Sequence, residues 1–243
     1  MYKNLRTIVT ICARGGSKGV PGKNVRPLLG TPLVAYTIKQ ALSLKWADRI
    51  IVSTDDKHIK SIAEECGLEV PFLRPANLAL DKSPKVPSII HAVMTAEKHW
   101  HENFDLILDL DPTTPLRLSE DIVGVLEALL SNPKAISSFS VTPAYKNPYV
   151  TMVESDIEGF AKIVKKPKQP IGRRQDAPQV YEIVGSAYAI HRSFLEGISY
   201  FPTEKNAFYV MPEDRSIDID REIDFEIIEF LMKKRSNLNK SSK

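Results

Sequence analysis

The residues best suited to chemistry come early in the chain, where a strand-like run leads into a loop of glycines and cations. Residues 8–13 are mostly apolar, and the loop that follows contains Arg14, Gly15, Gly16, Ser17, Lys18, Gly19, Gly22, Lys23 and Asn24. Glycine lets the backbone approach an anion closely and turn its N–H groups towards it, and Lys and Arg neutralise phosphate charge. The loop therefore predicts a polyphosphate site rather than a flexible surface turn. It matches neither the P-loop pattern G-x-x-x-x-G-K-S/T nor the dinucleotide pattern G-x-G-x-x-G.

Two acidic residues near the end of the chain are candidates for holding a metal ion. Asp218 and Asp220 alternate with Ile217 and Ile219, so the two carboxylates share one side of an extended segment. Mg²⁺ takes oxygen ligands, commonly one or two carboxylates together with substrate phosphates. The alternative is that Asp220 caps the last helix while Asp218 is exposed. Beside a polyphosphate loop, the metal interpretation is favoured.

Two more polar turns follow predicted strands. Asp55 comes after the run at 49–54, where it either contributes to a ligand site at the carboxyl ends of the strands or caps the next helix. Asp111 ends the run at 105–111, and two prolines stiffen the turn between it and Arg117. A stiff turn can aim Asp111 and Arg117 into the same crevice; otherwise Arg117 forms a structural ion pair.

Alternating strand and helix patterns must position these turns. Helices are predicted at residues 31–44, with Thr31 as N-cap, and at 57–66, 88–100, 119–130 and 221–234; strands are predicted at 7–13, 49–54, 69–72, 105–111, 136–141, 183–190 and 207–211. This alternation predicts an α/β fold, with a mostly parallel sheet flanked by helices on both faces. Residues 143–182, with a strand-like piece at 149–153, break the pattern. They are predicted to form a lid or a dimer contact within a single domain of residues 1–243.

Composition narrows the class of protein. The formal net charge is +3 over 243 residues and no basic stripe is present, which argues against a nucleic-acid partner. No apolar stretch is long enough to span a membrane, so no membrane association is expected. The two cysteines, Cys12 and Cys66, lack metal-ligand spacing. Reduced thiols in a cytoplasmic protein are the simple expectation.

Taken in order, these motifs resemble those of the acylneuraminate cytidylyltransferases, the CMP-sialic acid synthetases. The matching segments are residues 13–19 with Lys23 and Asn24, then 53–55, 112–117 and 216–220, and the resemblance covers nearly the whole chain. It implies a Rossmann-like nucleotidyltransferase fold, a homodimer, and Mg²⁺ as the cofactor. It also implies that the substrates are CTP and a nonulosonic sugar acid.

The resemblance further implies roles for individual residues. Catalysis would depend on Arg14, Lys18, Lys23, Asp218 and Asp220, of which the two aspartates would bind the metal. The nucleotide would contact Ala13, Arg14, Gly15, Gly16, Ser17, Lys18, Lys23, Asn24, Asp55 and Arg74. The sugar acid would contact Asp111, Arg117, Arg174 and Glu182, with Arg174 near its carboxylate.

The sugar side departs from the family pattern, whereas the nucleotide side is intact. Asp111 stands where relatives that use N-acetylneuraminate usually carry glutamine, Glu182 stands at a basic position, and Val184 replaces the usual asparagine before Gly185. The predicted reaction is therefore transfer of CMP to a differently substituted nonulosonic acid, such as a legionaminic or pseudaminic relative. The alternatives are a nucleotidyltransferase for Kdo or a sugar 1-phosphate, and a catalytically silent nucleotide-binding module.

Overall fold

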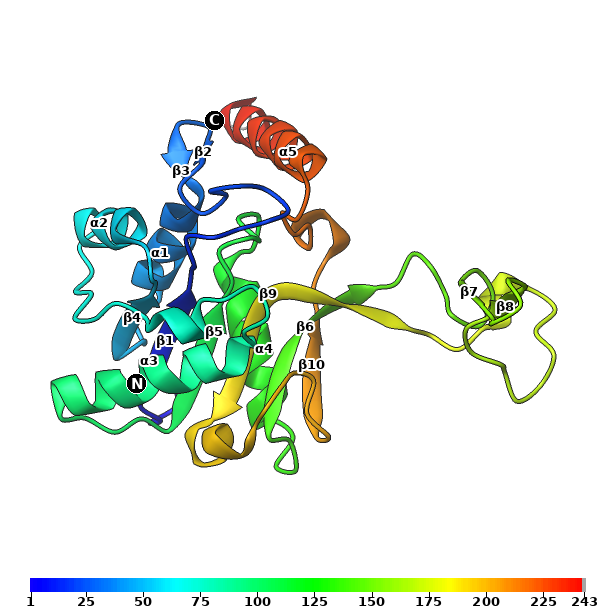
Figure 1. Ribbon diagram of the computed structural model, residues 1–243, viewed down its shortest axis with the longest axis horizontal. Helices are drawn as coiled ribbons and strands as arrows, with labels where there is room; N and C mark the ends of the chain where they lie inside the picture. The colour runs from blue at the N-terminus through cyan, green and yellow to red at the C-terminus, as the bar shows by residue number, and fades with distance from the viewer. Residues whose placement is uncertain (242–243) are drawn as a thin grey trace.

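One six-stranded sheet forms the centre of the molecule in the computed structural model, which describes residues 1–241 (Figure 1). Its strands, in spatial order, are β10 (Asn206–Val210), β6 (Ser137–Pro143), β9 (Tyr181–His191), β5 (Leu106–Leu110), β1 (Thr7–Cys12) and β4 (Arg49–Ser53). β5, β1 and β4 are parallel neighbours, as are β10 and β6, while β9 runs antiparallel to the strands on both sides of it. The mostly parallel sheet predicted from the sequence is confirmed.

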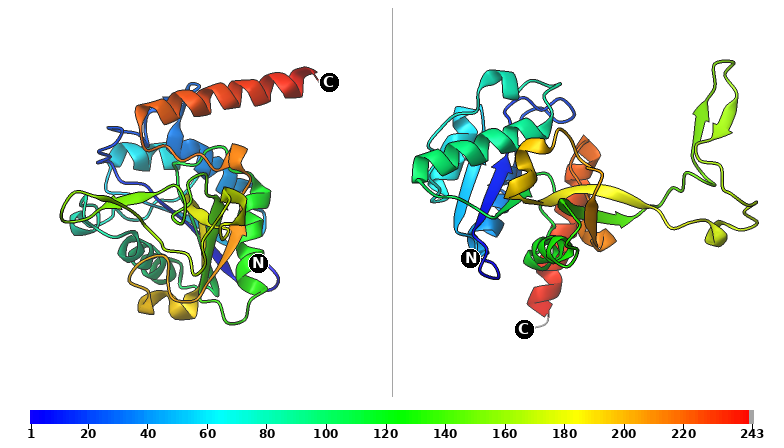
Figure 2. Two further views of the ribbon diagram at one scale, coloured as in Figure 1. Left: turned by 90° about the vertical axis from the view of Figure 1, so that its right-hand side faces the viewer. Right: turned by 90° about the horizontal axis from the view of Figure 1, so that it is seen from below.

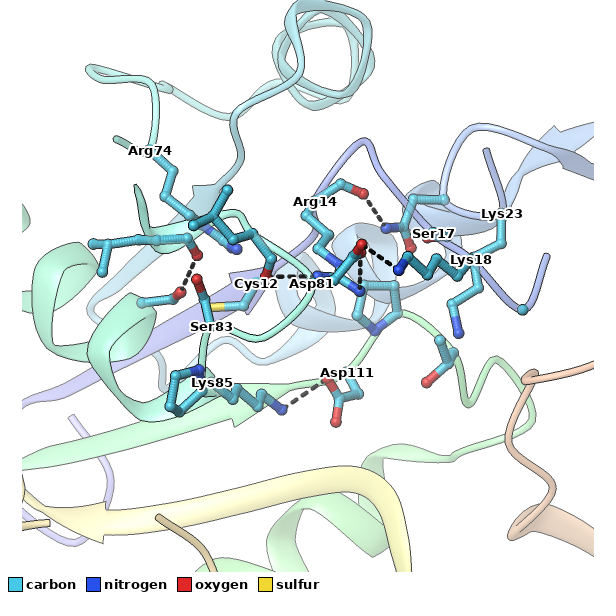
Figure 3. A pocket seen from close by; sticks show the side chains of 18 of the residues that line it. Cys12, Arg14, Ser17, Lys18, Lys23, Arg74, Asp81, Ser83, Lys85 and Asp111 are labelled. Carbon is cyan, nitrogen blue, oxygen red and sulfur yellow. Dashed lines mark hydrogen bonds and ion pairs between the residues drawn. The ribbon is translucent and has the colours of Figure 1, made fainter. Parts of the chain in front are cut away.

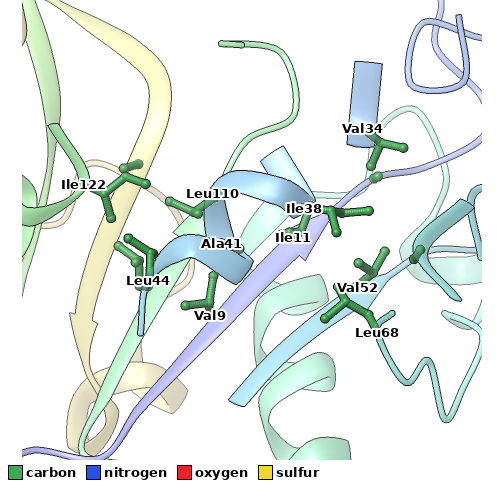
Figure 4. Packing of buried hydrophobic residues seen from close by; sticks show 14 of the residues in the cluster. Val9, Ile11, Val34, Ile38, Ala41, Leu44, Val52, Leu68, Leu110 and Ile122 are labelled. Atoms are coloured by element: carbon green, nitrogen blue, oxygen red, sulfur yellow. The ribbon is translucent and has the colours of Figure 1, made fainter. Parts of the chain in front are cut away.

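Helices cover both faces of this sheet. α1 (Leu33–Ser43), α2 (Lys57–Glu65) and α4 (Ser119–Leu130) pack on one face, and α3 (Lys85–Trp100) packs on the other (Figure 1). Side chains of β1 alternate between the two cores, because Val9 and Ile11 face the first and Ile8 faces the second. Figure 4 shows the first core, where Ile38 of α1 packs among residues of β1 and β4.

A third, smaller core joins the end of the chain to its beginning. α5 (Glu222–Ser241) contributes Phe225 and Ile228, which pack with Leu33 of α1, with Val20 of the loop after β1 and with Ile219. The short strands β2 (Pro27–Leu28) and β3 (Thr31–Pro32) pair between that loop and α1. This packing fixes the acidic segment before α5 against the glycine-rich loop.

Some element boundaries differ from the sequence prediction. Pro32, without any side-chain hydrogen bond, is the N-cap of α1, so the predicted Thr31 cap is wrong. α3 begins three residues early, at Lys85, because prolines are tolerated in a first helical turn. Residues 69–72 form no strand, and α5 continues to Ser241 rather than ending at 234. The short 3₁₀ segments η1 (Ala76–Leu78), η3 (Arg192–Gly197) and η4 (Glu213–Arg215) were not predicted.

Residues 144–180 project from the body as a long arm (Figures 1 and 2). The arm leaves the sheet after β6 and returns into β9, and these strands pair at its root through Pro143 and Tyr181. It carries the antiparallel hairpin β7 (Val153–Ser155) with β8 (Ala161–Ile163), and η2 (Arg174–Asp176). The strand predicted at 149–153 is not formed. Apolar side chains of the arm, such as Ile157 and Phe160, are exposed.

Candidate active site

A cavity of about 390 Å³ opens at the carboxyl ends of β1 and β5 (Figure 3). Open parallel sheets bind their ligands at this edge. Segments far apart in the sequence line it, and they include eight of the predicted site residues: Arg14, Ser17, Lys18, Lys23, Asn24, Arg74, Asp111 and Asp220. Ala13, Gly15 and Gly16 belong to the same loop but do not line the cavity.

Neighbouring side chains hold the loop after β1 in shape. Asn24 Nδ2 donates a hydrogen bond to the Arg14 carbonyl at 2.9 Å, and the Gly15 N–H donates to Asp55 Oδ1 at 3.1 Å. Asp55 therefore contacts the loop backbone rather than the cavity. The helix cap that sequence left open for Asp55 is provided by Asp56, whose carboxylate accepts hydrogen bonds from the first N–H groups of α2.

Arg74 is fixed between the end of β4 and the cavity. Its side chain is buried, and its Nε donates to Ser53 Oγ at 3.0 Å. Its backbone N–H donates to the Thr54 carbonyl at 2.7 Å, so the residue is held at both ends. A guanidinium placed in this way presents a fixed positive edge to the cavity.

Asp81 faces the loop cations, although no motif in the sequence marks it. Its carboxylate lies 2.8 Å from Lys18 Nζ and 3.4 Å from an Arg14 nitrogen, and Arg14 also donates to the Leu80 carbonyl at 2.9 Å. The hydrogen bond from Lys18 holds the pKa of Asp81 below its ordinary value. The two cations thus bind a carboxylate at the position where the sequence predicts phosphate.

The acidic segment before α5 touches the glycine-rich loop. Lys23 Nζ donates to the Ile219 carbonyl at 2.7 Å and lies 3.2 Å from Asp220 Oδ1. A Cβ on Gly19 would stand 2.4 Å from the Asp220 carbonyl oxygen, so only glycine allows this approach. The backbone N–H of Asp220 donates to Asp224, which caps the start of α5 and leaves the Asp220 carboxylate facing the cavity.

Asp218 is the most perturbed carboxyl group of this segment. Its Oδ1 is buried with no hydrogen-bond partner among the described residues. Burial, supplemented by the charges of Asp111 and Asp220, raises its pKa to about 6. Gly185 completes the surroundings, since a Cβ there would lie 2.5 Å from Asp218 Oδ2 and 3.5 Å from Asp111 Oδ2. Thr113 donates a hydrogen bond to the carboxylate, but a buried carboxylate with one unpartnered oxygen and like charges beside it still costs free energy unless a cation joins it.

The acidic group fits a hard divalent cation. Within residues 1–241 no group of three or more His, Cys, Asp or Glu side chains is arranged as a complete metal site. Mg²⁺ needs only one or two protein carboxylates when phosphate oxygens supply the remaining ligands. The unpartnered oxygen of Asp218 and the cavity-facing carboxylate of Asp220 are suitable donors.

Arg117 lies outside the cavity, in contrast to the expectation that it faces the same crevice as Asp111. It is 1% exposed, and its guanidinium donates to the Asp111 and Ser186 carbonyls, to Thr37 Oγ1 and to Gln40 Oε1. Burial lowers its pKa to about 10. Arg117 therefore ties the turn after β5 to α1 and β9, and holds Asp111 in place through the backbone.

Arg174 and Glu182 also lie away from the cavity of their own chain. Arg174 belongs to η2 on the arm, where its guanidinium donates to the Tyr145 carbonyl and lies 5.4 Å from the centre of the Tyr145 ring. Glu182 is exposed in β9 at the root of the arm. Neither residue lines the 390 Å³ cavity, so a single chain does not bring the predicted sugar-side residues together.

Lys85 and Asp109 form a buried ion pair beside Asp111 that sequence analysis missed. Lys85 is the first residue of α3 and lines the cavity, while Asp109 lies within β5. A charged residue inside an apolar strand was the available signal, since Asp109 interrupts the run of β5.

Comparisons with known proteins place the chain in context. The sequence matches the family described as Cytidylyltransferase over residues 8–242. It is 38% identical to a CMP-N,N'-diacetyllegionaminic acid synthase of Campylobacter jejuni, over 93% of this chain and 94% of the relative. It is 37% identical to the post-translational flagellin modification protein B of Campylobacter coli, over 94% of this chain and 96% of the relative.

A solved structure supports the fold. CMP:2-keto-3-deoxy-manno-octonic acid synthetase complexed with CTP superposes with a TM-score of 0.67 at 17% identity, covering 95% of this chain and 99% of that one. At this identity the likeness concerns the fold alone, and it confirms the α/β architecture predicted from the sequence.

Proposed function

Because the chain belongs to the cytidylyltransferase family, we propose that it transfers CMP from CTP to the anomeric hydroxyl of a nonulosonic sugar acid and releases pyrophosphate. One observation carries the proposal: the glycine-rich loop, its cations and Asp220 from the segment before α5 meet at one cavity. A CTP-using reaction also agrees with the 38% identical relative, which is named as a CMP-N,N'-diacetyllegionaminic acid synthase.

The triphosphate is assigned to the loop after β1. Arg14, Lys18 and Lys23 line the cavity there and offset the charge on the triphosphate and on the departing pyrophosphate. Asp81 pairs with Arg14 and Lys18, so it must give up these ion pairs when phosphate binds to the two cations. Arg74, fixed by Ser53, is assigned to the nucleotide.

In the proposed step, the anomeric oxygen of the acceptor forms a bond to the α-phosphorus, and the bond from that phosphorus to the pyrophosphate oxygen breaks. The hydroxyl proton is released. Such transfers depend on alignment and charge neutralisation more than on covalent help from the protein. Asp218 and Asp220 are the residues assigned to Mg²⁺, which when bound polarises the phosphate and favours ionisation of the attacking hydroxyl.

The acceptor is assigned to the Asp111 side of the cavity. An aspartate here, in place of the glutamine expected for enzymes that use N-acetylneuraminate, favours a differently substituted sugar acid. The identity to a legionaminic acid enzyme points the same way. N,N'-diacetyllegionaminic acid is therefore the acceptor that we propose to test first, with pseudaminic and N-acetylneuraminic acids as comparators.

The arm is proposed to join two chains into a homodimer. It exposes apolar side chains along its length, and it carries Arg174, which does not line the cavity of its own chain. A second copy would cover the apolar residues. It would also allow Arg174 to bind the acceptor carboxylate in the neighbouring cavity, where a planar fork suits two oxygens.

We also propose that the reaction takes place in the cytoplasm. Cys12 and Cys66 are free thiols in the described chain, as is usual for a reducing compartment. The helices described between residues 1 and 241 include none that is long and apolar enough to cross a membrane.

Pyrophosphate release with CTP and purified nonulosonic acids tests the function. Turnover is expected with at least one of them, and Asp220→Ala is expected to lose orders of magnitude in kcat while keeping its circular dichroism spectrum. Release with Kdo or with a sugar 1-phosphate and not with nonulosonic acids supports the other transferase. Tight CTP binding with no release across the panel supports a silent nucleotide-binding module.

A further inference from the structure

Lys85 lines the cavity, and its ammonium group contacts side chains of the same chain. Its Nζ lies 2.6 Å from Asp109 Oδ2, 2.7 Å from Asp111 Oδ1 and 4.3 Å from the centre of the Tyr188 ring. Two carboxylates and one aromatic face therefore surround the ammonium group, which pairs with them by charge. Lys85 thus differs from Lys18, whose side chain is 78% exposed and free to follow an arriving phosphate.

Hydrogen bonds from neighbouring strands and turns fix the two aspartates that pair with Lys85. Asp109 is fully buried in β5, and its other oxygen accepts a hydrogen bond of 2.6 Å from Thr10 Oγ1 of the neighbouring strand β1. Asp111 is held through its backbone, whose carbonyl accepts from Arg117 and whose N–H donates to the Ser186 carbonyl. Lys85 therefore connects a fixed carboxylate to the cavity-facing one and sets the direction of Asp111.

The part of the cavity formed by Lys85 and Asp111, here called the Asp111 corner, has a charge that indicates which substrate binds there. Lys85 and Asp111 lie apart from the group formed by Arg14, Ser17 and Lys18 (Figure 3). A carboxylate repels the triphosphate, which the loop cations attract, so the Asp111 corner remains for the acceptor. Asp111 Oδ2 is turned towards Gly185 and Asp218, beside the assigned metal ligands. The corner is next to the place where the acceptor oxygen must meet the α-phosphorus.

We propose that Lys85 is a positioning residue for acceptor specificity: by pairing with Asp111 it aims that carboxylate at the sugar acid. A carboxylate paired with an ammonium group accepts hydrogen bonds, so the Asp111 corner selects an acceptor that offers an O–H or an amide N–H at this point. It rejects one that offers only a carbonyl oxygen, since the buried charge would be left unmatched. The inference rests on the proposed cytidylyl transfer.

Steady-state kinetics of the full-length enzyme test the proposal, with CTP and N,N'-diacetyllegionaminic acid each varied in turn. Lys85→Gln removes the ammonium group, and Asp111→Asn turns the acceptor-only group into one that also donates. We expect each variant to raise the KM for the sugar acid by about 10- to 100-fold, the range for a lost charged hydrogen bond. The KM for CTP should stay within about twofold. Lys82→Gln, an exposed lysine three residues earlier, is the matched control and should behave as the wild type.

The KM changes of the single and double variants distinguish a positioning role of Lys85 from a merely structural one. Because Lys85 acts through Asp111, the Lys85→Gln/Asp111→Asn double variant should be no worse than the poorer single variant. Additive losses, or equal rises in the KM of CTP and of the sugar acid, would overturn the proposal. If Lys85→Gln fails to fold because Asp109 is left uncompensated, Lys85→Gln/Asp109→Asn removes both buried charges and is measured instead. An unchanged sugar-acid KM in that variant also overturns the inference.

The wild-type enzyme distinguishes the two levels of failure. Absence of turnover by the wild type with any nonulosonic acid counts against the proposed function itself. Wild-type turnover combined with a normal sugar-acid KM in the Lys85 variants counts against the role of Lys85 alone.

Discussion

Gly19→Ala is the sharpest perturbation of the junction between the glycine-rich loop and the acidic segment. The added Cβ would lie 2.4 Å from the Asp220 carbonyl oxygen, whereas ordinary contacts begin at 3.4 Å. The obstacle is backbone and cannot rotate away, so the loop and Asp220 must separate by about 1 Å. A displacement of that size at a phosphoryl-transfer site costs about 100-fold in rate. The strain should also lower the free energy of unfolding by about 1–3 kcal/mol.

Pyrophosphate release at saturating CTP and Mg²⁺, together with thermal melting, measures both effects. Gly197→Ala is the matched control, because a Cβ there meets nothing within 4 Å and the residue lies outside the cavity. We expect kcat to fall by about 100-fold for Gly19→Ala and to stay unchanged for Gly197→Ala. Equal activity in the two variants would show that the contact between loop and acidic segment does not matter for catalysis.

Three further predictions concern the same site. Gly185→Ala places a Cβ 2.5 Å from Asp218 Oδ2 and should raise the Mg²⁺ concentration for half-maximal activity by about 10- to 100-fold; an unchanged Mg²⁺ titration contradicts this. Asp81→Asn removes the carboxylate that competes with phosphate for Lys18 and Arg14, so at low salt the KM for CTP should fall by up to about fivefold, and a higher KM argues against the assignment. Carbon-13 NMR of the metal-free protein should show Asp218 titrating near a pKa of about 6, so that its charge and Mg²⁺ binding are lost as the pH falls through that value. Adding Mg²⁺ should move the titration lower, and a metal-free midpoint near 4 would show that the carboxyl is not desolvated.

Much of the fold could be predicted from periodicity and capping. α4 has the predicted bounds, residues 119–130. β1 is one residue shorter than predicted and β5 is one residue shorter at each end, because their apolar patterns are regular. The prediction failed where local propensity was weak or tertiary packing decided. Residues 69–72 look β-like but find no partner strand, and Thr31 is paired in β3 instead of capping α1.

The site was predictable only in part, for a physical reason. The types and spacing of the glycines, cations and alternating aspartates indicate phosphate and metal binding. The sequence alone therefore predicted that the loop after β1 and the two aspartates before α5 act at one site. Asp81 and Lys85 lie in an irregular segment and at a helix start, and their roles depend on partners far along the chain. For Arg117 the sequence motif predicted a residue facing the cavity, but the packing of the turn buries its side chain instead.

The arm could be located by its broken pattern but not given a shape from the sequence. Its boundaries near residues 143 and 182 follow from the loss of strand and helix alternation, while its projection from the body depends on how β6 and β9 pair at its root. Sedimentation of the chain with and without Ile157→Glu and Phe160→Glu bears on the proposed dimer, since both side chains are exposed on a single chain.

In the proposed reaction, the loop after β1 and the aspartates before α5 hold one metal–triphosphate complex. A crystal structure of the enzyme with CTP and Mn²⁺, with the metal located by anomalous scattering, would reveal this complex. We expect a Mn²⁺ peak within ligand distance of the carboxylates of Asp218 and Asp220, with the triphosphate against Lys18 and Lys23. A metal bound elsewhere, or a triphosphate away from that loop, would contradict it.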